Sequence, residues 1–183
     1  MKYVVTTLFL LCVTACKPPA TSDTASRGDS TETREFASAP IDSPVTENSV
    51  WVEADRAGRL LFGEPGKTPL MALACEEQDG KRMIHITRFA AADPEAKAII
   101  ALIGNGHMAR LPIDAKWNGR VWLWEGIYTA SSLDLSVFTG PRRVEATVPG
   151  SGSVILNASQ RPARLIEACR RVPLGALPSP PPA

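Results

Sequence analysis

The chain has 183 residues, of which 44% are hydrophobic and 21% charged, a length and composition that fit one folded domain with appendages and exclude a wholly disordered chain. Its formal net charge is +1, so we expect no nucleic-acid partner. The 16 prolines concentrate in 17–49 and 173–183, which marks both ends as non-globular.

Residues 1–15 have the layout of a signal peptide: Lys2, then an apolar run over 3–13 that is too short to span a membrane. The tetrapeptide Val13-Thr14-Ala15-Cys16 resembles the lipobox of bacterial lipoproteins. That resemblance implies cleavage before Cys16, a diacylglycerol on its thiol and acylation of the new amino terminus, which would anchor the chain stably in a lipid bilayer. The alternative is an ordinary signal peptide with an incidental cysteine. By resemblance to sorted lipoproteins, Lys17 after the anchor favours the outer membrane, facing the periplasm.

Residues 16–49 read as the lipidated cysteine followed by a disordered tether, rich in Ser, Thr, Ala, Pro and charge, with Phe36 as its only aromatic residue. Such a segment buries too little apolar surface to offset its ordering entropy. Residues 173–183 are expected to form a disordered, proline-rich tail.

Alternating apolar and polar residues predict a β-rich domain over 50–172, with strands separated by turns such as Asp79-Gly80 and Asn118-Gly119. The segment 131–138 suits either a helical turn or an irregular edge. The expected strands cover 49–55, 59–62, 69–76, 82–89, 97–103, 107–117, 119–125, 142–148 and 153–158.

One helix is expected at the end of the domain, capped by Ser159, with Leu165, Ile166, Cys169 and Val172 forming an apolar stripe. The fold class is therefore mainly β: an antiparallel β-sandwich or open barrel with one C-terminal helix. Removal of the signal and lipidation would leave two thiols, Cys75 and Cys169. In an oxidising periplasm we expect them to form a disulfide, because the alternative metal site lacks further ligands.

No phosphate loop, nucleophile elbow or metal-binding helix motif is present, so the sequence predicts no enzyme, no metal and no cofactor. We expect His85 to be an exposed strand residue and His107 a loop residue. Asp114 and Asp134 are the carboxylates that could serve as acids if either lay in a cleft.

The tryptophans Trp117, Trp122 and Trp124 are the most suggestive group. Trp122 and Trp124 lie two apart, so they share one face of a strand, which is either a binding surface for a sugar, a lipid or a partner, or is covered. Arg161 and Arg164, together with Arg171, fall on one side of the final helix. They could meet an acidic partner, or Arg164 could pair with Glu167.

Residues 62–171 resemble a family of small alphaproteobacterial envelope lipoproteins of uncharacterised activity. The resemblance is carried by Phe62-Gly63-Glu64-Pro65-Gly66, Leu73-Ala74-Cys75-Glu76, Leu133-Asp134, Phe138-Thr139-Gly140 and Arg164-Leu165-Ile166-Glu167-Ala168-Cys169-Arg170. It implies a β-rich domain with one disulfide. Membrane-anchored lysozyme inhibitors share the size, anchor, β-rich body and disulfide, but their Ser-Ala-x-Gly loop is absent here.

The expected function is a non-enzymatic binding or accessory module of the envelope, with a periplasmic protein or cell-wall partner. The alternative is an inhibitor of a cell-wall-degrading enzyme such as lysozyme.

Overall fold

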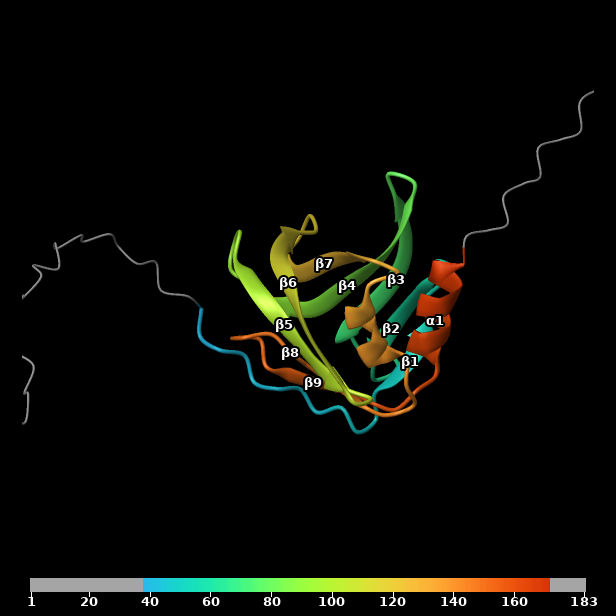
Figure 1. Ribbon diagram of the computed structural model, residues 1–183. Helices are drawn as coiled ribbons and strands as arrows, with labels where there is room; N and C mark the ends of the chain where they lie inside the picture. Colours follow the sequence, from blue (N-terminus) through green and yellow to red (C-terminus); the bar gives the residue numbers. More distant parts are fainter. Residues whose placement is uncertain (1–37, 172–183) are drawn as a thin grey trace, which may run out of the picture. The chain divides into compact units, whose positions relative to one another are not determined.

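The structure is a computed structural model that describes residues 38–171 (Figure 1). The predicted signal peptide, Cys16, the tether as far as residue 37, Val172 and the proline-rich tail lie outside the described residues. The described part belongs to one unit, Ala37–Ala183.

Nine strands, a 3₁₀ helix and an α-helix follow one another within residues 38–171. The strands form where apolar residues alternate: in β6 the buried residues Ala109, Leu111, Ile113 and Ala115 are two apart. The elements are β1 (Val50–Glu53), β2 (Arg59–Gly63), β3 (Met71–Gln78), β4 (Lys81–Ala91), β5 (Lys97–Gly104), β6 (His107–Trp117), β7 (Trp122–Thr129), η1 (Leu133–Phe138), β8 (Val144–Thr147), β9 (Ser153–Leu156) and α1 (Arg161–Arg170).

All the strands belong to one antiparallel sheet in the order β1-β2-β3-β4-β7-β6-β5-β8-β9. Strands β5, β6 and β7 form a meander that returns to lie beside β4, a Greek-key arrangement. The sheet curls into a nearly closed barrel whose edges are β1 and β9 (Figure 1). The expected mainly β fold with one C-terminal helix is therefore confirmed, in its open-barrel form.

Residues 38–49 lie along the β9 edge instead of belonging to a free tether. The Ile41 amide donates to the Gly150 carbonyl at 2.8 Å, and the Ser153 amide donates to Ser43 Oγ at 2.9 Å. Asn157 Nδ2 donates to the carbonyls of Thr46 at 2.7 Å and Ser49 at 2.8 Å. The predicted boundary at residue 49 was wrong, because polar composition does not reveal that backbone groups at a sheet edge need partners.

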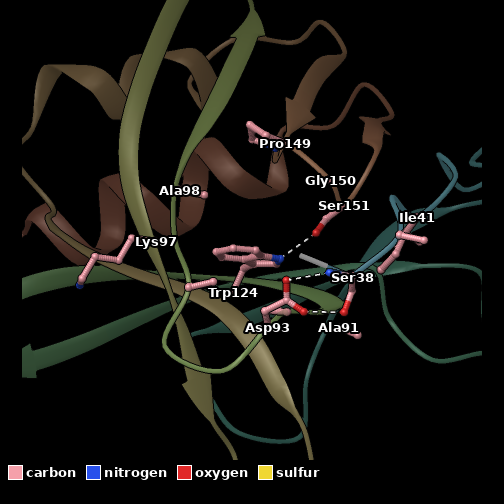
Figure 2. A pocket seen from close by; sticks show the side chains of 13 residues that line it. Ser38, Ile41, Ala91, Asp93, Lys97, Ala98, Trp124, Pro149, Gly150 and Ser151 are labelled. Carbon is pink, nitrogen blue, oxygen red and sulfur yellow. Dashed lines mark hydrogen bonds between the residues drawn. The ribbon is translucent and has the colours of Figure 1, made fainter. Parts of the chain in front are cut away.

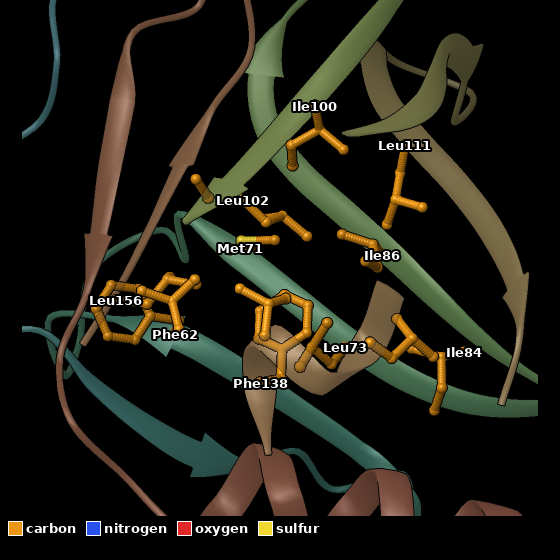
Figure 3. Packing of buried hydrophobic residues seen from close by; sticks show 14 of the residues in the cluster. Phe62, Met71, Leu73, Ile84, Ile86, Ile100, Leu102, Leu111, Phe138 and Leu156 are labelled. Atoms are coloured by element: carbon orange, nitrogen blue, oxygen red, sulfur yellow. The ribbon is translucent and has the colours of Figure 1, made fainter. Parts of the chain in front are cut away.

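The interior of the barrel is filled by apolar side chains from both halves of the sheet and from η1 (Figure 3). The segment 131–138, left open by the sequence, contains a 3₁₀ helix whose Leu135, Val137 and Phe138 are buried. Fully buried side chains of the sheet include Phe62, Met71, Leu73, Ile84, Ile86, Ile100, Leu102 and Leu156.

Helix α1 packs on β2, β3 and β4, with Ile166 fully buried and Cys169 2% exposed. Cys169 forms the expected disulfide with Cys75, with 5.6 Å between their Cα atoms. The N-cap residue is Gln160 instead of the expected Ser159, although Ser159 Oγ still accepts a hydrogen bond from the Arg161 amide at 3.2 Å.

Candidate functional site

A cavity of about 470 Å³ opens beside the loop that joins β4 to β5 and the turn that joins β8 to β9 (Figure 2). Its lining combines the indole of Trp124 with small apolar side chains and a few polar groups. The residues that matter for its chemistry are Ser38, Asp93, Lys97, Ala98, Trp124 and Ser151.

Trp124 lies on the inner face of β7 and is only 6% exposed. Its Nε1 donates a hydrogen bond of 2.7 Å to Ser151 Oγ, which fixes the indole against the turn between β8 and β9 (Figure 2). Trp122, on the same face, is half-buried and packs against the core. The face that these two tryptophans share is therefore mostly covered: Trp124 is buried and borders the cavity, and Trp122 remains partly exposed.

Arg88 lies behind Trp124, its direct neighbour in the β4–β7 pairing, and is 3% exposed. Its guanidinium donates to the carbonyl oxygens of Leu70 (3.1 Å), Phe89 (3.2 Å) and Ser151 (3.1 Å). Burial lowers the pKa of Arg88, and no carboxylate pairs with it within residues 38–171. Arg88 and Trp124 together hold Ser151 in place, so this wall of the cavity is preorganised.

Arg88 was not predicted as a site residue from the sequence, although the alternation of residues in β4 indicates its position. Ile84 and Ile86 point inward, and the same alternation puts residue 88 on the inner face. A charged residue at a position that alternation assigns to the core indicates a structural or functional role.

The rim of the cavity is where the N-terminal segment joins the domain. Asp93 accepts hydrogen bonds from the Ser38 amide at 3.1 Å and the Ser38 hydroxyl at 2.5 Å, and these bonds lower the pKa of Asp93. The neighbouring Ala92 amide donates to the Trp122 carbonyl at 3.1 Å. The cavity therefore combines an apolar wall with the Asp93 carboxylate at its rim. Lys97 also lines it, but its ammonium group donates to Asp114 outside the barrel.

Outside the barrel, a row of polar side chains crosses five neighbouring strands. His85 Nδ1 lies 3.3 Å from Glu76 Oε1, and its Nε2 lies 3.1 Å from Glu125 Oε2. Asp114 is the direct cross-strand partner of Glu125 and accepts a 3.1 Å hydrogen bond from Lys97 Nζ. The expectation of an exposed His85 was wrong: its side chain is 18% exposed, because carboxylates reach it diagonally from both neighbouring strands, Glu76 from the same hairpin and Glu125 from a strand 40 positions away.

Strands β6 and β7 pair over only four residues of each strand, and Tyr128 lies beyond this paired stretch, where the two strands separate. Its hydroxyl donates to the Pro112 carbonyl at 2.5 Å. Burial, with a smaller contribution from the charge of Asp114, raises the pKa of Tyr128 to about 12. A groove of about 380 Å³ lies here, bordered by Asp114, Glu125 and Tyr128.

Asp134 lies elsewhere, in the first turn of η1, where its amide and carboxylate both bond to the hydroxyl of Ser132. The two carboxylates singled out from the sequence are thus not brought together. Within residues 38–171 no group of three or more His, Cys, Asp or Glu side chains is arranged to hold a metal ion. His107 is the first residue of β6 and not a loop residue.

Arg161 and Arg164 share a second groove, of about 450 Å³, between α1 and the β1–β2 hairpin. Arg59 also lines this groove, and Arg161 Nη1 lies 3.5 Å from Glu53 Oε1. The alternative pairing of Arg164 with Glu167 is not among the ion pairs of the described residues. This groove shares no lining residue with the Trp124 cavity, so the tryptophans and arginines singled out from the sequence belong to separate surfaces.

None of the helices in the part of the chain that the structure describes has the length and apolar character needed to cross a membrane. The sequence matches no family model, and comparison with curated proteins and with solved structures finds no match.

Proposed function

We propose that this chain is a lipid-anchored binding protein of the bacterial envelope, on the periplasmic side, that holds a compact amphipathic molecule in the Trp124 cavity without transforming it. The lipobox-like Val13-Thr14-Ala15-Cys16 supports the anchor. The observation that carries the binding role is the cavity itself.

The size and lining of the cavity support this role. Small-molecule sites enclose roughly 300–1,000 Å³ and combine a mostly apolar wall with a few polar groups that orient the ligand. Here the volume is about 470 Å³, the wall includes Trp124, and Ser38 and Asp93 provide polar groups at the rim. An indole packs against the apolar face of a sugar ring or a flat ring system, and the polar rim suits hydroxyl or amino groups on its edge.

The rigidity of the cavity also favours binding, because preorganised sites lose less entropy when a ligand binds. The buried hydrogen bonds from Trp124 and Arg88 to Ser151 fix one side of the cavity. Ser38 and Asp93 fix the other side, at the point where the N-terminal segment arrives.

A binding role is favoured over catalysis because the His85 imidazole and the two cysteine sulfurs already have partners. His85 contacts two carboxylates, Glu76 and Glu125, instead of a hydroxyl or thiol that it could activate. Cys75 and Cys169 are joined in a disulfide.

The test is native mass spectrometry of a chain shortened to Lys17–Ala183 and exported to the periplasm by a signal peptide of a soluble protein. We expect a bound small molecule on the wild-type domain. Ala98→Phe should exclude it, because Ala98 lines the cavity, whereas Ala101→Phe, on the outer face of the same strand, should retain it.

An empty wild-type domain, or equal occupancy in the Ala98→Phe variant, would contradict the cavity as the binding site. Chemical conversion of the bound molecule by the purified domain would contradict the non-catalytic role.

A further inference from the structure

The tip of the β6–β7 hairpin, residues 116–122, presents apolar side chains to solvent. Trp117 is 56% exposed and Val121 is 47% exposed. The ring of Trp117 packs at a tilt against that of the half-buried Trp122, with 6.0 Å between ring centroids. Packing on the core does not explain why Trp117 and Val121 are apolar, because of these three residues only Trp122 packs against the core.

The turn holds these side chains in a defined arrangement. Asn118 Oδ1 accepts hydrogen bonds from the amides of Arg120 at 2.9 Å and Val121 at 3.0 Å. Gly119 has φ +96°, a conformation that L side chains rarely adopt. The exposed Lys116 and Arg120 flank the apolar tip, and neither takes part in an ion pair within residues 38–171.

The tip lies at the end of the domain where the described chain begins. Trp122 accepts a hydrogen bond from Ala92, and the next residue, Asp93, accepts two from Ser38. Ser38, the first residue that the structure describes, therefore lies at the same end of the domain as this hairpin. Acidic Asp93 and Glu95 are also at this end, but they belong to the β4–β5 loop and not to the tip.

We propose that the β6–β7 hairpin tip is a bilayer-contact site, with Trp117 and Val121 at the lipid–water interface and Lys116 and Arg120 facing lipid phosphates. Indoles favour the interface because one part of the ring system is apolar and the other donates a hydrogen bond. Basic side chains are attracted to anionic headgroups. The contact is independent of the ligand in the Trp124 cavity and of the lipid on Cys16, and it orients the domain on the membrane.

The experiment is vesicle sedimentation of the Lys17–Ala183 chain, which retains the unit Ala37–Ala183 and lacks Cys16. The vesicles contain phosphatidylethanolamine with about a quarter phosphatidylglycerol. We expect the wild-type chain to bind, and the Trp117→Ser/Val121→Ser variant to bind at least about fivefold more weakly.

The matched control is Met108→Ser, which removes a side chain of similar exposure, 60%, from the other end of strand β6. Its binding should equal that of the wild type. Lys116→Gln/Arg120→Gln should weaken binding at low salt and flatten its dependence on ionic strength.

A second measurement needs no variant. Phospholipids brominated on their acyl chains should quench part of the wild-type tryptophan fluorescence, since Trp117 is exposed while Trp51 and Trp124 are buried. Wild-type chain that stays in the supernatant without quenching, or an equal loss of binding with Met108→Ser, would overturn the proposal.

Discussion

Removal of the disulfide between Cys75 and Cys169 should lower the free energy of unfolding substantially. The bond links residues 94 positions apart in the sequence. In the chain-entropy model, closing a loop of this length restricts the unfolded chain by about 4.7 kcal/mol at 25 °C. Globular domains have a total stability of only about 5–15 kcal/mol, so the loss is a large share of the whole.

The variant of choice is Cys75→Ala/Cys169→Ala, because serine would place a hydroxyl in the buried site of Cys169, which is 2% exposed. The melting temperature should fall by about 15–20 °C, from roughly 4 °C per kcal/mol for a domain of this size. The fold itself should persist, since Ile166 of α1 remains packed against the barrel.

The assay is equilibrium unfolding in urea, followed by tryptophan fluorescence, on the Lys17–Ala183 chain. Reduction of the wild-type chain should reproduce the midpoint of the double-alanine variant. The denaturant dependence (m-value) should increase, because an unfolded chain without the cross-link exposes more surface. A loss below about 1 kcal/mol with an unchanged m-value would refute the entropic reasoning.

Arg88→Met should cost about 2–4 kcal/mol of stability in urea unfolding, because the carbonyls of Phe89 and Ser151 lose their charged donor; a cost within about 0.5 kcal/mol would contradict this role. The folded state raises the pKa of Tyr128 from 10.0 to about 12, so between these values it binds more protons than the unfolded chain and stability should fall as pH rises. Tyr128→Phe should remove that fall, and an identical pH profile in both proteins would count against it. Intact-mass analysis of the full chain from bacterial membranes should show cleavage before Cys16, added acyl groups and a mass lower by two hydrogen atoms for the disulfide. Cys16→Ser should lack the acyl groups, and an unlipidated wild-type protein would contradict the lipid anchor.

Much of the fold could be read from the sequence because its evidence is local. The alternation in β4 and β6 and turns such as Asp79-Gly80 follow from the two-residue period of a strand and from the residues that favour positive φ, here +52° at Asp79 and +71° at Gly80. The Cys75–Cys169 pair followed from counting thiols. The assignment of 38–49 to the tether failed, since its hydrogen-bond partners are residues such as Gly150 and Asn157, more than 100 positions away.

The candidate site was predicted only in part. The sequence singled out Trp124 but could not decide whether its face was covered, because that depends on Ser151 and on the curl of the sheet. It did not single out Asp93, whose importance arises from its contact with Ser38, 55 positions earlier.

The sequence by itself determined the strand content, the C-terminal helix and the disulfide, and it predicts the lipid anchor. Apolar periodicity and turn residues are local patterns along the chain, and the cysteine pair follows from the number of cysteines. The strand order, the location of residues 38–49, the burial of Arg88 and the His85 contacts were decided only by the tertiary structure. Each depends on which strands become neighbours: the polar row of Glu76, His85 and Glu125 exists because β7 pairs with β4 after a Greek-key return. Such pairing is a collective outcome of burying the whole core, and no local pattern encodes it.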